Sequence, residues 1–193
     1  MGPAGLDSGF ERLRTHAMDL LRHWPAPDRE QEDLRQDYLA HLRSHAGACA
    51  KAGPPQHVTA SALVVDPRRG RTALVLHGKA GRWFQPGGHL EATDADLAAA
   101  ALREATEETG LPGLRVDPAP LRLDRHALDR AFGTCREHLD VQFLAVAGEF
   151  VDTAVSGESS DVRWWALDAV PDPDAVGALV AAARARLNAS RAR

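Results

Sequence analysis

Cysteine is scarce in this chain, and its scarcity restricts the chemistry that the chain can perform. The 193 residues include two cysteines, Cys49 and Cys135. Two cysteines do not make a disulfide framework, and they are too few for a zinc site built from cysteine alone. We therefore expect the fold to depend on a hydrophobic core, for which this length is sufficient.

Long apolar runs and an excess of basic residues are also missing. No stretch reaches the roughly 18 consecutive apolar residues of a membrane span. Residues 1–10 lack the basic start and apolar stretch of a signal peptide. The net charge of −4 disfavours binding to a nucleic acid polymer, which normally requires a basic surface. We expect a cytoplasmic protein with neither a membrane nor a nucleic acid polymer as partner; free nucleotides stay compatible with the charge, because a cation can mediate contact with their phosphates.

The first 50 residues have the apolar spacing of two helices. The first set recurs at helical intervals: Phe10, Leu13, Ala17, Leu20, Leu21 and Trp24. The segment Pro25–Pro27 breaks the pattern, and Asp28 with Gln31 resembles a capping box that starts a second helix. The second stripe is Leu34, Tyr38 and Leu42. We expect a helical hairpin, residues 1–52, that packs on the rest of the chain; a lid or the contact of a homodimer is the less favoured alternative.

The remaining residues, 53–193, alternate between strand and helix patterns and predict a second domain. We expect strands at 57–65, 72–76, 137–147 and 162–167, and a helix at 95–109. We expect a last helix that Asp172 caps and that begins at Pro173. One face of it carries Val176, Leu179, Val180, Ala183 and Leu187. A Gly-rich loop, Pro86–Gly88, precedes the first of these helices. The mixture predicts an α/β (α+β) fold class, preceded by the N-terminal helical hairpin.

Three glutamates cluster on the helix predicted at 95–109. At 100° per residue, Glu104, Glu107 and Glu108 fall within an arc of roughly 100°. Like charges at this spacing repel one another, so the cluster indicates a compensating cation such as Mg²⁺ or Mn²⁺, which prefers oxygen ligands. A solvated acidic helix face is the simpler alternative. Two features favour the metal: Arg103 can pair with Glu107, and the glycines of Pro86–Gly88 permit close backbone approach to a ligand.

This segment resembles the signature of the Nudix hydrolase family. That signature is a glycine, five residues, a glutamate, seven residues, and R-E-U-x-E-E-x-G-U, where U is bulky and aliphatic. The matching residues are Gly88, Arg103, Glu104, Glu107, Glu108, Gly110 and Leu111. Three departures occur: Asp94 replaces the first glutamate, eight residues separate Asp94 from Arg103, and Ala105 replaces the aliphatic residue. None removes a carboxylate from the helix.

The resemblance implies a Nudix fold, in which a mixed β-sheet is sandwiched between helices, and it covers about residues 57–187. It also implies a metal site for Mg²⁺ (or Mn²⁺). The ligands that it implies are Gly87 through its carbonyl, Glu104, Glu107 and Glu108. Arg103 would orient the carboxylates, and many members take a further glutamate from a late loop. Glu158 is the best candidate for that glutamate, although an ordinary exposed loop acid is an equal alternative.

The implied activity is metal-assisted attack of water on a diphosphate linkage in a nucleoside-diphosphate-type small molecule. Glu104, Glu107 and Glu158 are each candidates for the general base. The alternative is a non-catalytic nucleotide-binding or regulatory Nudix domain, which usually loses these carboxylates. The isomerase branch is disfavoured because Arg82–Gln85 lacks the cysteine that it requires. Downstream markers of particular substrates are absent, so the sequence does not select a substrate.

Polar residues alternate with apolar ones in the strand predicted at 137–147. We expect His138 and Asp140, with the nearby His126, to contact substrate; a partly solvated polar strand face is the favoured alternative. Cys135-x-x-His138 with His126 or Asp140 could also form a zinc site. The second half of a ligand set is missing from the sequence around them, which disfavours zinc.

Overall fold

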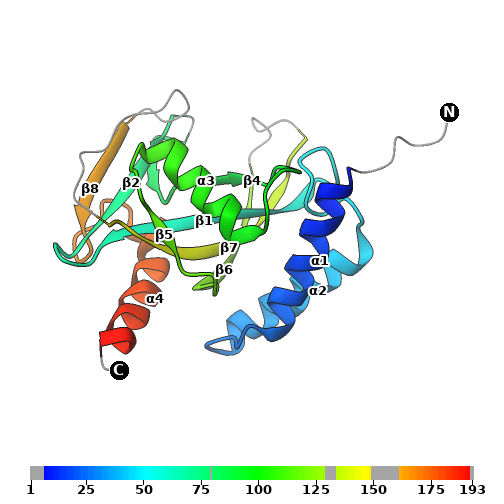
Figure 1. Ribbon diagram of the computed structural model, residues 1–193, viewed down its shortest axis with the longest axis horizontal. Coiled ribbons are helices and arrows are strands. Elements are labelled where there is room, and N and C mark those ends of the chain that lie inside the picture. Colours follow the sequence, from blue (N-terminus) through cyan, green and yellow to red (C-terminus); the bar gives the residue numbers. More distant parts are fainter. Residues whose placement is uncertain (1–6, 79, 129–133, 149–160, 192–193) are drawn as a thin grey trace. The chain divides into compact units, whose positions relative to one another are not determined.

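The computed structural model describes residues 7–78, 80–128, 134–148 and 161–191. In chain order the elements are α1 (Ser8–His23), α2 (Arg29–Ser44), β1 (Gln56–Asp66), β2 (Arg71–His77), β3 (Arg82–Phe84), β4 (Gly87–His89), α3 (Leu97–Thr109), β5 (Arg115–Val116), β6 (Arg122–Ala127), β7 (Glu137–Val146), β8 (Asp161–Ala166) and α4 (Pro173–Arg191) (Figure 1). The predicted helical hairpin and α/β class are confirmed. In these segments, no helix combines the length and apolar character that a membrane crossing needs.

The strands form a mixed sheet whose order within the described part of the chain is β3-β2-β1-β7-β5, with β4 on β1, β6 on β7 and β8 on β2. Within the second unit, α4 packs on the sheet (Figure 1). β2 is antiparallel to β1, β3 and β8, and β5 is antiparallel to β7. The four strands expected from sequence are β1, β2, β7 and β8. The patterns missed β3, β4 and β5, because two or three residues are too few to show alternation. They also missed the six-residue β6, because its two apolar residues, Leu123 and Ala127, do not alternate with polar ones.

The described chain divides into two compact units that do not follow the sequence order. The first unit comprises 1–60, 89–100 and 123–141; the second comprises 61–88, 101–122 and 142–193. β1, β7 and α3 each contribute residues to both units. The expected boundary between residues 52 and 53 stays a prediction.

In the first unit, the helical hairpin is joined to β6 by buried hydrogen bonds. Asp28 caps α2 by accepting from the Gln31 amide N at 2.9 Å, as the capping pattern predicts. The Gln31 side chain donates to the Leu123 carbonyl at 3.0 Å and accepts from the Leu123 amide at 2.6 Å. The Tyr38 hydroxyl donates to the Asp124 carbonyl at 2.6 Å. These three hydrogen bonds connect α2 to the backbone of β6.

In the second unit, α4 covers an apolar sheet face. Its inward residues are Val176, Leu179, Val180 and Ala183. They pack with Leu63, Val65, Leu74, Leu121 and Leu144 of the sheet and its connections. The periodicity predicted this helix face. The Asp172 carboxylate, expected to cap α4, instead accepts from the Trp83 amide at 2.8 Å and from Arg82 Nε at 3.2 Å, and so connects the start of α4 to β3.

Candidate active site

Helix α3 carries the clustered carboxylates, and both of its ends have a physical cause. The Asp96 side chain accepts from the Ala99 amide at 2.8 Å, which caps the start. Gly110 ends the helix with a φ of 65°, a conformation that glycine adopts without steric cost. The helix therefore begins at Leu97, slightly later than expected.

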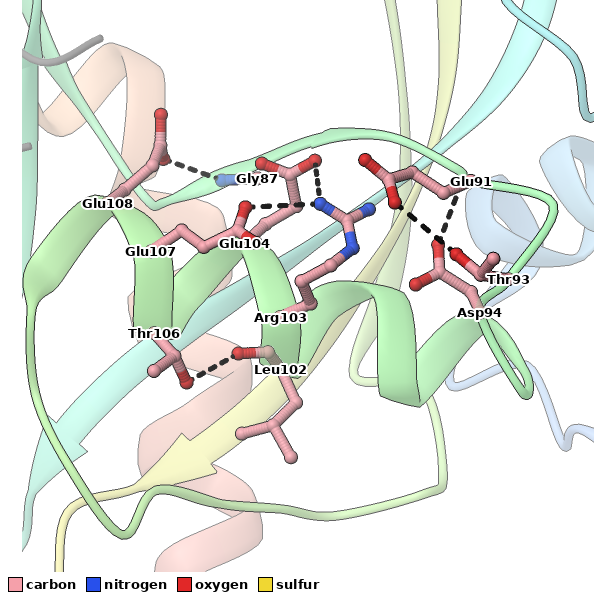
Figure 2. A network of polar contacts seen from close by, with 10 residues as sticks. All are labelled: Gly87, Glu91, Thr93, Asp94, Leu102, Arg103, Glu104, Thr106, Glu107 and Glu108. Carbon is pink, nitrogen blue, oxygen red and sulfur yellow. Dashed lines mark hydrogen bonds and ion pairs between the residues drawn. The ribbon is translucent and has the colours of Figure 1, made fainter. Parts of the chain in front are cut away.

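In the second unit, the Gly87 amide and the Arg103 guanidinium contact the three glutamates of α3. The Gly87 amide donates to Glu108 Oε2 at 3.0 Å. Arg103 Nη1 contacts Glu104 Oε1 at 3.0 Å and Glu107 Oε2 at 3.2 Å (Figure 2). The predicted Arg103–Glu107 pair is confirmed, and Arg103 also reaches Glu104. One guanidinium thus offsets the repulsion between two carboxylates.

Gly88 lies directly against Glu104. A Cβ atom at position 88 would lie 2.7 Å from Glu104 Oε1 and 2.8 Å from Cδ. The Glu104 side chain is 13% exposed, whereas that of Glu107 is 60% exposed. The first glycine of the motif therefore leaves space for the more buried of these two carboxylates.

Carboxylate oxygens and backbone carbonyl oxygens are the ligands that a hard divalent cation prefers. Glu104, Glu107 and Glu108 lie on one face of α3 (Figure 2). Arg103 contacts the first two carboxylates, and the Gly87 amide donates to the third. The donor chemistry fits Mg²⁺ or Mn²⁺. The Gly87 contact given by the structure is through its amide, so a role for the Gly87 carbonyl stays a prediction.

The departures from the family signature have local explanations. In the first unit, Asp94 is buried, and its Oδ2 accepts from the Glu91 amide at 2.7 Å, so this carboxylate closes a turn. The extra residue is accommodated between this turn and α3. Ala105, in the second unit, is fully buried, where a larger aliphatic side chain would require more space.

The structure gives the other predicted site residues different surroundings. Glu158 lies outside the described residues. Asp140 is 3% exposed and accepts from Thr59 Oγ1 at 3.0 Å. His126 is exposed, and its Nδ1 lies 2.9 Å from Asp124 Oδ2; this contact raises the pKa of His126. Their roles as substrate contacts, and that of His138, stay predictions.

His138 belongs to a cluster that the sequence analysis identified only in part. The cluster comprises His57, His89, Cys135 and His138, all in the first unit, with one potential ligand atom from each within 4.8 Å of the others. Neither His126 nor Asp140, the partners considered from sequence, is in this set. His57 and His89 were missed because they lie on β1 and β4, distant in sequence from Cys135.

The cluster histidines are predominantly neutral at pH 7. Burial lowers the pKa of His89 to about 4, with the charge of Lys51 as a smaller cause. Burial lowers the pKa of His138 to about 3, with neighbouring imidazoles contributing repulsion. The pKa of His57 is also lowered, chiefly by burial.

A family model, described as the NUDIX domain, matches residues 55–184. The chain belongs to the Nudix family. The matched range includes α3 and its glutamates, and the helical hairpin precedes it. As a member, the protein is assigned to the hydrolases that act on acid anhydrides. No curated protein matches the chain.

Solved Nudix structures share the fold. A hydrolase of the NUDIX family from Clostridium perfringens is 23% identical with a TM-score of 0.52, covering 67% of this chain and 95% of that one. The Ap4A hydrolase of C. elegans, in a binary complex, is 20% identical with a TM-score of 0.56, covering 68% and 98%. The NUDIX domain of Shewanella oneidensis NrtR, complexed with ADP ribose, is 23% identical with a TM-score of 0.51, covering 68% and 88%. At these identities the likeness concerns the fold.

Proposed function

We propose that this Nudix protein cleaves a diphosphate linkage in a nucleoside-diphosphate-type small molecule, using a divalent cation bound at α3. The observation that supports this most is the arrangement of Glu104, Glu107 and Glu108 on one helix face, held by Arg103 and the Gly87 amide. A merely solvated acidic face would not need a glycine against Glu104 or a guanidinium shared between two carboxylates.

Each residue has a distinct role in this proposal. Glu104, Glu107 and Glu108, with the Gly87 carbonyl, would hold Mg²⁺ or Mn²⁺. When bound, such a cation neutralises diphosphate oxygens and makes a water molecule more acidic. Arg103 orients Glu104 and Glu107, since its guanidinium contacts both.

The reaction also needs a group that accepts the proton of the attacking water. Glu104 and Glu107 are candidates on α3, and Glu158 is the candidate from the segment before β8. Glu107 is the more exposed of the two helix candidates, and an exposed carboxylate can reorient toward a bound substrate. Substitution of each carboxylate by its amide distinguishes among the three.

A nucleotide is the proposed substrate class. The names of two solved relatives support it, because one is an Ap4A hydrolase and the other is in complex with ADP ribose. His126, which is exposed, is a proposed contact of this chain for such a substrate. A cytoplasmic location and a homodimer are further predictions.

Incubation of the full chain with Mg²⁺ and a panel of nucleotide diphosphates tests this function. The panel contains ADP-ribose, Ap4A and nucleoside triphosphates, and the products are resolved by chromatography. We expect metal-dependent cleavage within the diphosphate linkage of at least one compound, abolished by EDTA and restored by added Mg²⁺. Binding of these compounds without any hydrolysis would instead favour the non-catalytic alternative, which the retained carboxylates disfavour.

A further inference from the structure

We propose that His57, His89, Cys135 and His138 form a four-coordinate zinc site in the first unit, separate in composition from the carboxylates of α3. The four side chains bring three imidazoles and one thiol together, with their ligand atoms within 4.8 Å of one another. Tetrahedral zinc with nitrogen and sulfur ligands places its ligand atoms about 3.3 to 3.6 Å apart. Small side-chain rotations would close the remaining difference.

The three imidazole rings surround a common centre. The ring centroids are 5.0 Å apart for His57 and His89, 5.2 Å for His57 and His138, and 5.1 Å for His89 and His138. Cys135 Sγ lies 4.0 Å from His89 Nε2. Three nearly equal separations with a thiol alongside match the arrangement of three nitrogens and one sulfur around a single ion.

Two of the imidazole nitrogens have the environment expected of metal ligands. His57 Nε2 and His138 Nε2 are buried, and neither has a hydrogen-bond partner among residues 7–78, 80–128, 134–148 and 161–191. Buried polar atoms are normally paired. A zinc ion would satisfy both atoms at once, whereas ordinary core packing of histidine would leave both unsatisfied.

The backbone fixes the tautomer of His57 in the form that a metal requires. His57 Nδ1 lies 3.1 Å from the Pro54 carbonyl oxygen. A carbonyl only accepts, so Nδ1 carries the proton, and the lone pair of the neutral ring lies on the unpartnered Nε2. Metal-bound histidines typically donate their second ring nitrogen to a carbonyl or carboxylate in this way.

The donor set selects zinc over the cation proposed at α3. Imidazole and thiolate are borderline and soft ligands that favour zinc, whereas Mg²⁺ favours oxygen. On binding, Cys135 would lose its proton to solvent and bind as thiolate. The ligands come from β1, β4, the residues before β7, and β7 itself, so the ion would tie together three strands of the first unit.

Metal analysis of the purified full chain tests the site without any measurement of activity. We expect about one zinc ion per chain by elemental analysis after dialysis against buffer free of chelator. After stripping and loading with Co²⁺, we expect the visible absorption of tetrahedral cobalt and a near-ultraviolet band from thiolate-to-cobalt charge transfer. The wild-type spectrum requires no variant, so it decides the question even if a substituted chain fails to fold.

Matched variants identify the ligands. Cys135→Ser should abolish the charge-transfer band, and His138→Gln should reduce bound zinc strongly. Cys49→Ala removes the other buried thiol and should keep both signals, because Cys49 is outside the cluster. Glu104→Gln should keep full zinc binding, which separates this site from the proposed catalytic one. The inference is overturned if the wild type binds no zinc or holds copper or iron in its place. It is also overturned if the cobalt spectrum of Cys135→Ser is the same as that of the wild type.

Discussion

Gly88 leaves room for the carboxylate of Glu104, which we propose as a metal ligand. Because a Cβ atom there would lie 2.7 Å from Glu104 Oε1, Gly88→Ala should displace the Glu104 carboxylate. We expect a reduction of kcat/KM by at least about tenfold, the scale of misplacing a group that stabilises the transition state, together with weaker activation by Mg²⁺. Activity measured across a magnesium titration checks both effects.

Gly177→Ala is the matched control for that substitution. Gly177 lies in α4, where an added Cβ would meet only Pro173 Cβ at an ordinary 3.8 Å. This variant should keep wild-type activity and gain a little stability, because alanine is the better helix former. Equal losses in both variants would mean that close packing at Gly88 has no specific role.

Substitution of Glu158 tests whether the segment before β8 supplies the proton acceptor. If it does, Glu158→Gln should reduce kcat strongly and leave substrate affinity nearly unchanged, since the group would act only in the chemical step. Asp161→Asn is the control: Asp161 pairs with Arg163 at 2.6 Å at the start of β8, which is a structural contact. Steady-state kinetics of both variants distinguish the cases, and small, equal effects would return the role of base to α3.

At the scale of elements, the helical hairpin depends on Gln31. Its side chain pairs with both the amide and the carbonyl of Leu123 in a buried position. Gln31→Ala removes both of these buried hydrogen bonds, so the free energy of unfolding should fall by about 1–3 kcal/mol. Urea denaturation followed by circular dichroism measures this change. Gln36→Ala, which removes an exposed contact to Glu32, should stay near wild type, and an equally small effect at Gln31 would contradict the anchoring role.

Deletion of the whole hairpin should lower the stability of the protein further than Gln31→Ala does. Residues Leu13, Ala17, Leu21, Tyr38 and Leu42 of α1 and α2 are fully buried. Deleting residues 1–50 should therefore expose apolar surface and lower solubility and thermal stability more than it lowers turnover. Light scattering and thermal melts of the truncated chain measure the effect. A truncated protein that stays monomeric, soluble and equally heat-stable would show that the hairpin is a loose appendage.

The elements that could be predicted are those whose residues repeat a long pattern. The helices of the hairpin, α3 and α4 each show apolar or capping signals over several turns, and so they were found with small errors at their ends. β3, β4 and β5 owe their existence to pairing with neighbouring strands, so two or three residues alone carried no signal. Asp172 shows the same limit, because its carboxylate is engaged by β3, which is distant in sequence.

For the whole molecule, local sequence revealed one candidate site and concealed most of another. Glu104, Glu107 and Glu108 lie within five residues, so helical geometry alone placed them on one face. The His and Cys cluster draws on residues 57, 89, 135 and 138, which meet only through the strand arrangement. The pair Cys135-x-x-His138 was the only local sequence signal of this cluster. The buried, unsatisfied Nε2 atoms of His57 and His138 are visible only in three dimensions.

In the proposed reaction, the α3 carboxylates hold the cation that drives hydrolysis. A comparison of the turnover of wild type, Glu104→Gln and Glu108→Gln at saturating Mg²⁺ tests this role, with Glu30→Gln on the exposed face of α2 as control. Neutral glutamine keeps the shape and removes the charge that the cation requires. We predict that each α3 variant loses at least roughly a hundredfold in kcat while the control is unchanged; near-wild-type turnover in both α3 variants would contradict the account.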